Sequence, residues 1–409
     1  MVAQAQAAKL VYRFSEGDAS MGDLLGGKGS NLCEMTRMGL PVPPGFIITT
    51  QVCRDYLAGD YTLPGGLAAT VRERIGELEE SVGHEFGSRT NPLLVSVRSG
   101  ARISMPGMMD TILNLGINDE IVEGLGAMMG DRRPAWDAYR RFVQIYAEVV
   151  QEVAPEPFEE CLAEHKARAG VELDYELSAG QLQAVTADFK EIARESAGAA
   201  PPDDPWEQLF GAVEAVFRSW NNPRAIVYRN QYGIDHDMGT AVTIMGMVYG
   251  NLGPTSGTGV LFTRNPSNGK REVYGEFLSN AQGEDVVAGV RTPEPLSALA
   301  GVMPERSEEL LNLASNLEKH YRDVQDVEFT IEQGRLYLLQ TRNAKRTPLS
   351  AVKTAVDMVR EGMIDREQAL KRVDPEEITQ LLVPQFASDL SRDELDGRLV
   401  ATGAGASPG

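Results

Sequence analysis

A lysine lies among closely spaced glycines in the segment LLGGKGSN, residues 24–31. Gly26, Gly27 and Gly29 leave backbone N–H groups accessible, and Lys28 adds a cation just before the predicted start of a helix. Phosphate groups are held in this way in many proteins. A P-loop is not predicted, because Gly29 stands where that motif needs Ser or Thr to hold magnesium. The alternative interpretation is a glycine-rich turn with a solvated lysine.

A second candidate cation, Arg98, comes at the end of an apolar strand pattern in SVRSGARISMPGMMDT, residues 96–111. Gly100 and Gly107 favour a pliable loop after it. A guanidinium in such a place can bind a phosphate group with two parallel hydrogen bonds. The alternative is an arginine that pairs with a carboxylate at the surface.

The third candidate is a predicted hairpin, DVEFTIEQGRLYLLQTR, over residues 326–342. Residues 332–334 are expected to form a three-residue turn that ends in a left-handed glycine. This turn pairs Asp326 with Gln340, and alternation along the strands then brings four polar side chains to one face: Asp326, Glu328, Gln340 and Arg342. Two carboxylates, an amide and a guanidinium suit Mg²⁺ and a nucleotide phosphate. The alternative is the solvent face of an ordinary amphipathic hairpin.

Cysteine and histidine spacing points to no further site. The three cysteines, Cys33, Cys53 and Cys161, have no CxxC spacing. We therefore expect neither a disulfide framework nor a zinc site built on cysteines, and the usage suits a reducing cytosol. The four histidines show no HxH or HExxH spacing, and no metal site is predicted from them.

The charge composition argues against two classes of binding partner. The 409 residues include 39 Lys and Arg against 59 Asp and Glu, a formal net charge of −20. Nucleic acids and anionic membranes are bound through clustered positive charge, so neither is expected as a partner. No apolar run approaches the ~18 residues of a membrane-spanning helix, and no signal-peptide pattern is present. A cytoplasmic location is expected.

The elements that position the candidates form a mixed α and β pattern. Strands are predicted near Phe46 and from Leu93, and helices over residues 30–38 and 67–82. Only helical periodicity is found from residue 118 to 200, where GAAPPDDP ends one helix and begins the next. Strand patterns dominate from 239 to 342, and helical ones return after Thr347.

Taken together and in order, these motifs resemble one family. LLGGKGSNLCEMTRMGLPVPPGF, SVRSGARISMPGMMDTILNLG, TSGTGVLFTRNPSNG, GEFLSNAQGEDVVAGVRTP and DVEFTIEQGRLYLLQTRNAKRT closely resemble the N-terminal nucleotide-binding domain of the pyruvate, phosphate dikinases. MPGMMDT and NAQGEDVVAG are specific to that family. The GGK turn, the arginine strand and the LQTR ending are shared with phosphoenolpyruvate synthase and other dikinases. The likeness extends from about residue 10 to the end of the chain.

The resemblance implies an α+β fold of the ATP-grasp type, in which two lobes clasp ATP. Its lobes would be built from residues 1–117 and from 201–346, the latter with the ATP and magnesium hairpin, and residues 118–200 would be an all-helical insertion. A helical linker over 347–399 would follow. Residues 400–409 would begin a phosphohistidine domain, because ATGAGASPG (401–409) resembles the opening of one, so the chain is expected to be a piece of a longer enzyme.

The resemblance also implies ATP and Mg²⁺ as ligands and assigns roles to the candidate residues. Lys28, Arg98 and Arg342 would neutralise the triphosphate during catalysis. Glu328 and Gln340 would serve Mg²⁺, and Asp326 would complete the polar wall around the metal and nucleotide.

In the family, this domain transfers the β,γ-pyrophosphoryl group of ATP to a histidine on a separate domain. Inorganic phosphate takes the γ-phosphoryl group, and the phosphohistidine then phosphorylates pyruvate; the full-length enzyme is expected to be a homodimer. Two alternatives stay open. One is a phosphoenolpyruvate synthase-type dikinase domain, and the other is a nucleotide-binding regulatory module without turnover.

Overall fold

A computed structural model of the chain describes residues 9–105, 107–287 and 291–381. Two predictions, the end of the helical linker over 382–399 and the start of a phosphohistidine domain at 400–409, lie outside these described residues. The chain forms two compact units. Unit 1 comprises residues 1–257, 279–291 and 330–340, and unit 2 comprises residues 258–278, 292–329 and 341–409.

Unit 1 contains a five-stranded sheet whose neighbouring strands are all antiparallel. Its strands lie in the order β1 (Val11–Arg13), β2 (Gly45–Ile48), β7 (Ala241–Gly246), β5 (Val95–Gly100) and β6 (Thr111–Leu115). Two short strands, β3 (Glu85–Phe86) and β4 (Pro92–Leu93), form a parallel pair beside it. The predicted strands near Phe46 and from Leu93 are confirmed.

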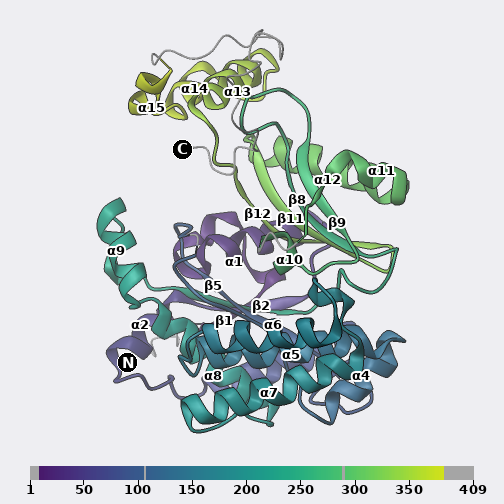
Figure 1. The fold of residues 1–409 in the computed structure, drawn as a ribbon. Coiled ribbons are helices and arrows are strands. Elements are labelled where there is room, and N and C mark those ends of the chain that lie inside the picture. The colour runs from purple at the N-terminus through teal and green to yellow at the C-terminus, as the bar shows by residue number, and fades with distance from the viewer. Residues whose placement is uncertain (1–8, 106, 288–290, 382–409) are drawn as a thin grey trace, which may run out of the picture. The chain divides into compact units, whose positions relative to one another are not determined.

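Helices cover both faces of this sheet (Figure 1). One face carries α1 (Gly22–Arg37), which contacts β2, β5 and β7. The other face carries α8 (Pro205–Ser219) and α5 (Arg132–Val149). The remaining helices of the unit are α2 (Thr50–Ala58), α3 (Leu67–Val82), α4 (Ile121–Met129), α6 (Glu156–Ala169), α7 (Ala179–Ala197), α9 (Pro223–Tyr232) and α10 (Gly283–Val287). Every residue from 116 to 240 is described, and none of them is in a strand, so the all-helical character predicted for 118–200 is confirmed.

The main core of unit 1 fills the space between the sheet and α5, α7 and α8. Phe46, Ile244, Val97 and Ile112 lie side by side in one row across four strands and are at most 2% exposed. Because directly paired residues share a face, this row presents its apolar side chains to the helices together. Side chains alternate between the two faces along a strand, so the rows one residue before and one residue after this row face α1.

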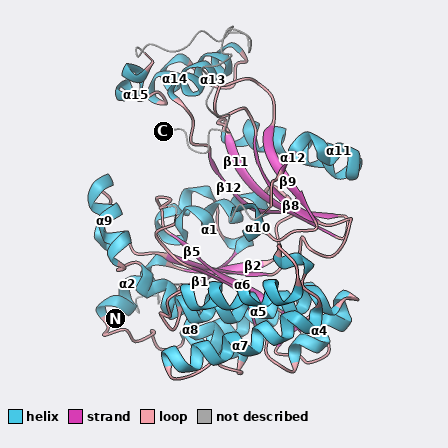
Figure 2. Ribbon diagram, in the orientation of Figure 1, coloured by secondary structure: helices cyan, strands magenta, loops and turns pink. Residues whose placement is uncertain are grey.

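The second five-stranded sheet has the order β10 (Glu294–Pro295), β9 (Tyr274–Ser279), β8 (Gly257–Phe262), β11 (Gln325–Glu332) and β12 (Arg335–Asn343). Figure 2 shows these strands in magenta. The helices of unit 2 are α11 (Leu299–Val302), α12 (Pro304–Tyr321), α13 (Pro348–Arg360), α14 (Arg366–Lys371) and α15 (Pro375–Gln380). The helical pattern predicted after Thr347 is confirmed as far as residue 381, and the chain as a whole is α+β.

Three local predictions were wrong in detail. The hairpin turn has two residues, Gln333 and Gly334, both with positive φ (46° and 80°), so the strands close at Glu332 and Arg335. Such a turn matches the twist of its strands better than the three-residue turn that we expected. The region from 239 to 342 also contains α12, whose buried Leu310, Ala314 and Leu317 follow helical spacing.

The third difference is that α1 begins well before the predicted start at Ser30 and is kinked at Gly26. The glycine turn therefore lies at the kink between two helical segments, the second of which begins at Gly27. Among the described helices, none is long and apolar enough to cross a membrane.

Candidate functional site

The glycine turn of unit 1 lies in direct contact with the end of β5. Gly26 has φ 69° and ψ 166°, and a Cβ atom there would lie 1.7 Å from the carbonyl oxygen of Gly100. The N–H of Gly27 donates to the carbonyl oxygen of Ala101 over 2.9 Å. Only glycine allows both this backbone angle and this approach. The helix resumes at Gly27, which places Lys28 in its first turn, where the partial positive charge of a helix is concentrated.

Arg98 lies inside β5, two residues before its end at Gly100, and not at the strand end as predicted. It pairs with Thr243 of β7, and Thr243 pairs with Ile47 of β2. Ile47 faces α1, because its side chain would contact a Cβ atom placed on Gly29. Since directly paired residues share a face, Arg98 is directed to the α1 side of the sheet.

Among the described residues, no surface carboxylate pairs with the guanidinium of Arg98 as the alternative interpretation requires. The side chain is half-buried, and its Nε atom is buried without a hydrogen-bond partner. The hydroxyl group of Thr243, in the same row, also lacks a partner. Within the described residues no ion pair of Arg98 is found. A buried polar group without a partner costs free energy, which an anionic ligand on this face would recover.

In unit 2 the polar end of the hairpin contains an ion pair. Arg342 donates from Nε to Oδ2 of Asp326 over 2.7 Å. The Asp326 side chain is 10% exposed and that of Arg342 is 41% exposed. Burial raises the pKa of Asp326, Glu328 raises it further, and Arg342 opposes the change. This ion pair brings two of the hairpin candidates together, but the two-residue turn does not pair Asp326 with Gln340 as the predicted three-residue turn would.

The other two hairpin candidates differ in their surroundings. Glu328 is half-buried, and no hydrogen bond or ion pair of its carboxylate is found in the described part of the chain. Gln340 is 8% exposed on β12. Lys28, Arg98 and Gln340 belong to unit 1, whereas Asp326, Glu328 and Arg342 belong to unit 2.

An ionic network that was not predicted from the sequence holds α10 within unit 1. Arg141 of α5 donates to Glu284 over 2.6 Å and to Asp285 over 2.7 Å, and also to Asp137 over 3.2 Å. The Arg141 side chain is 12% exposed. The neighbouring acids of GED at 283–285 were a visible signal, but their partner is over 140 residues away in sequence. This network fixes the NAQGEDVV segment against the helical part of the unit.

Comparison with known proteins agrees with the order of the motifs. A family model described as "Pyruvate phosphate dikinase, AMP/ATP-binding domain" matches residues 22–62, 59–299 and 298–363. The pyruvate, phosphate dikinases of Rhizobium meliloti (strain 1021) and Clostridium symbiosum are each 52% identical to this chain, over 98% of its length and 46% of theirs. A chloroplastic pyruvate, phosphate dikinase of Oryza sativa subsp. japonica is 51% identical, over 98% of this chain and 42% of its own length. The chain spans about half the length of these curated relatives.

Proposed function

The chain belongs to the pyruvate phosphate dikinase AMP/ATP-binding domain family, and we propose on this premise that it binds MgATP in an ATP-grasp fold. The lobes expected from the sequence were residues 1–117 and 201–346, but β7 (Ala241–Gly246) lies within the first sheet and the compact units divide at residue 257. Residues 118–200 remain the proposed insertion and 347–399 the proposed linker. The nucleotide-binding part of a longer phosphotransferase is the function that its residues support best.

One observation carries the proposal: Arg98 has a buried Nε atom without a partner and is directed to the sheet face on which the Gly26–Lys28 turn begins a helix. Two cationic groups and a helix N-terminus on one face are suited to an anion with several charges. A chain with a net charge of −20 would not hold a triphosphate without such local cations. Lys28 and Arg98 therefore bind phosphate oxygens in this proposal.

The hairpin supplies the remaining roles. Arg342 adds a third cation to the triphosphate. Glu328 and Gln340 would hold Mg²⁺ through a carboxylate and an amide oxygen, the hard donors that this ion prefers. Glu328 fits this role because its carboxylate has no hydrogen bond or ion pair within the described residues. When bound, Mg²⁺ neutralises charge that develops on the phosphate oxygens.

For phosphoryl transfer the protein mainly positions the groups and provides preset positive charge. In the proposed first step, an imidazole nitrogen of another domain attacks the β-phosphorus and AMP leaves, so the histidine carries pyrophosphate. Inorganic phosphate then takes the γ-phosphoryl group, which releases pyrophosphate and leaves phosphohistidine. That domain would next phosphorylate pyruvate to phosphoenolpyruvate. The histidine would be supplied by another part of the longer enzyme, which we propose acts as a homodimer.

The test combines this chain with a separately produced phosphohistidine domain of a dikinase, ATP, Mg²⁺ and inorganic phosphate. We expect AMP and pyrophosphate to appear, and to disappear when the acceptor histidine is replaced by alanine. AMP can leave before inorganic phosphate acts, so the products derived from the γ-phosphoryl group make the distinction. Pyrophosphate formed only when inorganic phosphate is present supports the proposal, whereas release of the γ-phosphoryl group as orthophosphate, with water as the acceptor, would instead indicate a phosphoenolpyruvate synthase-type domain. Nucleotide binding without any AMP would indicate a regulatory module and would overturn the proposed turnover.

A further inference from the structure

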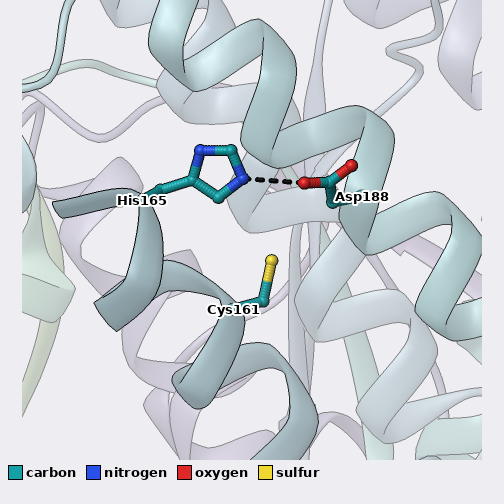
Figure 3. Close-up of side chains that lie close together, drawn as sticks. All are labelled: Cys161, His165 and Asp188. Atoms are coloured by element: carbon teal, nitrogen blue, oxygen red, sulfur yellow. Dashed lines mark hydrogen bonds and ion pairs between the residues drawn. The ribbon is translucent and has the colours of Figure 1, made fainter. Parts of the chain in front are cut away.

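Three side chains with metal-binding atoms meet at the contact of two helices in unit 1. Cys161 and His165 lie on α6 and Asp188 lies on α7. Figure 3 shows the thiol, the imidazole and the carboxylate directed toward one another across the helix pair. One ligand atom from each residue lies within 4.8 Å of the other two. None of these residues belongs to the proposed nucleotide site.

The positions of the three side chains follow from helix geometry. Cys161 and His165 are four residues apart, and residues at this spacing are neighbours on one side of a helix. The two helices are held together by Phe158 of α6 and Phe189 of α7, whose rings pack edge to face with centroids 5.1 Å apart. Both phenylalanines are fully buried. Asp188 is thus held opposite the Cys161–His165 pair by the packing beneath it.

The separations are close to those of a metal centre. In a tetrahedral zinc site with bonds of about 2.0–2.3 Å, ligand atoms are about 3.3–3.8 Å apart. His165 Nε2 and Asp188 Oδ2 are 2.7 Å apart and hydrogen-bonded. An ion would replace this hydrogen bond, and small side-chain rotations would bring all three atoms to bonding distance. The 56% exposure of the Asp188 side chain leaves a path from solvent.

A role for Cys161 as a nucleophile is not supported. Burial, with Asp188 and Glu164 adding to it, raises the pKa of the thiol to about 11. A reactive cysteine needs the opposite shift, toward the thiolate. A metal-bound cysteine is also a thiolate, so Cys161 would release its proton to solvent when the ion binds.

We propose that Cys161, His165 and Asp188 bind one borderline-soft divalent transition-metal ion, such as Zn²⁺, with water in the fourth position. A thiolate and a carboxylate balance the two positive charges of the ion, and the imidazole is neutral. Mg²⁺ would not occupy this site, because it requires oxygen ligands and binds thiolates poorly. The bound ion would link α6 to α7.

The proposed site departs from an expectation from the sequence. The absence of CxxC and of histidine pairs argued against a metal site, but the Cys-x₃-His spacing places Cys161 and His165 on one side of a helix, as a chelating pair requires. The third ligand comes from the next helix, 23 residues beyond His165. Only the packing of α6 on α7 shows that the three belong together.

The test uses Co²⁺ as the probe with the untagged, chelator-treated chain, because a thiolate bound to Co²⁺ gives a charge-transfer absorption that oxygen ligands do not give. The other two cysteines, Cys33 and Cys53, are fully buried, so this absorption reports on Cys161. We expect one equivalent of Co²⁺ to produce it, one equivalent of Zn²⁺ to abolish it, and excess Mg²⁺ to leave it unchanged.

Variants then assign the ligands. Cys161→Ser should lose the charge-transfer band, and His165→Gln and Asp188→Asn should each weaken Co²⁺ binding by at least about tenfold. His84→Gln is the matched control, because His84 is half-buried, as His165 is, and lies far from the proposed ligands in sequence. Circular dichroism of each variant verifies that it is folded. Zn²⁺ should also slow alkylation of Cys161 in the unchanged chain, a measurement that needs no variant. Absence of the band in the unchanged chain, or a band that survives in Cys161→Ser, would overturn the proposal.

Discussion

The backbone N–H of Gly27 donates to the carbonyl oxygen of Ala101 over 2.9 Å, although 74 residues separate them. This hydrogen bond attaches the start of the second segment of α1 to the chain just beyond β5. Lys28 follows Gly27, and Arg98 precedes Ala101 by three residues. The same attachment therefore fixes the backbone positions of both proposed phosphate-binding cations of unit 1.

Replacing Gly26 with alanine should disrupt this attachment. The added Cβ atom would lie 1.7 Å from the Gly100 oxygen, on a backbone with φ 69°. We expect Gly26→Ala to lower the free energy of unfolding by at least about 2 kcal/mol, from left-handed strain together with overpacking. Gly39→Ala is the matched control, since Gly39 has φ 73° but no atom within 4 Å of the added Cβ. Urea denaturation measures both; equal losses in the two variants would show that the contact with Gly100 does not matter.

Replacing Arg98 with methionine should separate binding from stability. The variant removes a buried N–H group that has no partner, so the free energy of unfolding should stay the same or rise. ATP affinity should fall roughly 10- to 100-fold, the scale of one hydrogen bond to a charged group. Thermal denaturation and calorimetric titration check the two effects, with the exposed Arg366→Met as the control. A destabilised variant with unchanged ATP affinity would assign Arg98 a structural role.

Removing the Lys28 ammonium group should slow phosphoryl transfer. We expect Lys28→Ala to reduce the rate of AMP formation by ~100-fold or more in the assay with an acceptor domain, as for the loss of one preset donor. Lys371→Ala is a suitable comparison because Lys371 forms only a surface pair with Glu367. A rate equal to that of the unchanged chain would remove Lys28 from the site.

The pKa of Asp326 predicts a pH effect on stability. Burial, the largest cause, raises this pKa above its usual value of 3.8. A raised pKa in the folded state means that the contribution of Asp326 to stability is complete below that usual value and is lost as the pH rises through the folded-state pKa. The side chain in Asp326→Asn cannot ionise, so its contribution to stability does not fall as the pH rises. Without nucleotide, we therefore expect the variant to gain stability relative to the unchanged chain as the pH is raised from 3 to 7. A difference in unfolding free energy that does not vary with pH would contradict this account.

Local patterns made much of the architecture predictable. The helix over 67–82 was predicted to the residue, because its apolar spacing and flanking glycines are properties of the segment itself. The hairpin was predicted for the same reason, but its turn length was not. Gln333 adopts a positive φ, which is uncommon for glutamine and could not be predicted from its residue type.

Contacts between distant segments were not predictable from one sequence. Three such contacts depend on how helices and strands pack against one another after they form. They are the approach of Gly26 to Gly100, the ion pair of Arg141 with Glu284 and the hydrogen bond of His165 with Asp188. Sequence spacing constrains side chains within one helix or strand only. The candidate residues could be chosen by their chemistry, but their partners required the fold.

Calorimetric titration with ATP, with and without Mg²⁺, tests the central claim most directly when it compares the unchanged chain with Glu328→Gln. We predict Mg²⁺-dependent binding to the unchanged chain and to Glu308→Gln, a control at an exposed glutamate of the same unit. Glu328→Gln should remain folded and lose the Mg²⁺-dependent binding. The account would be contradicted if Glu328→Gln bound MgATP as tightly as the unchanged chain, or if the unchanged chain bound no nucleotide.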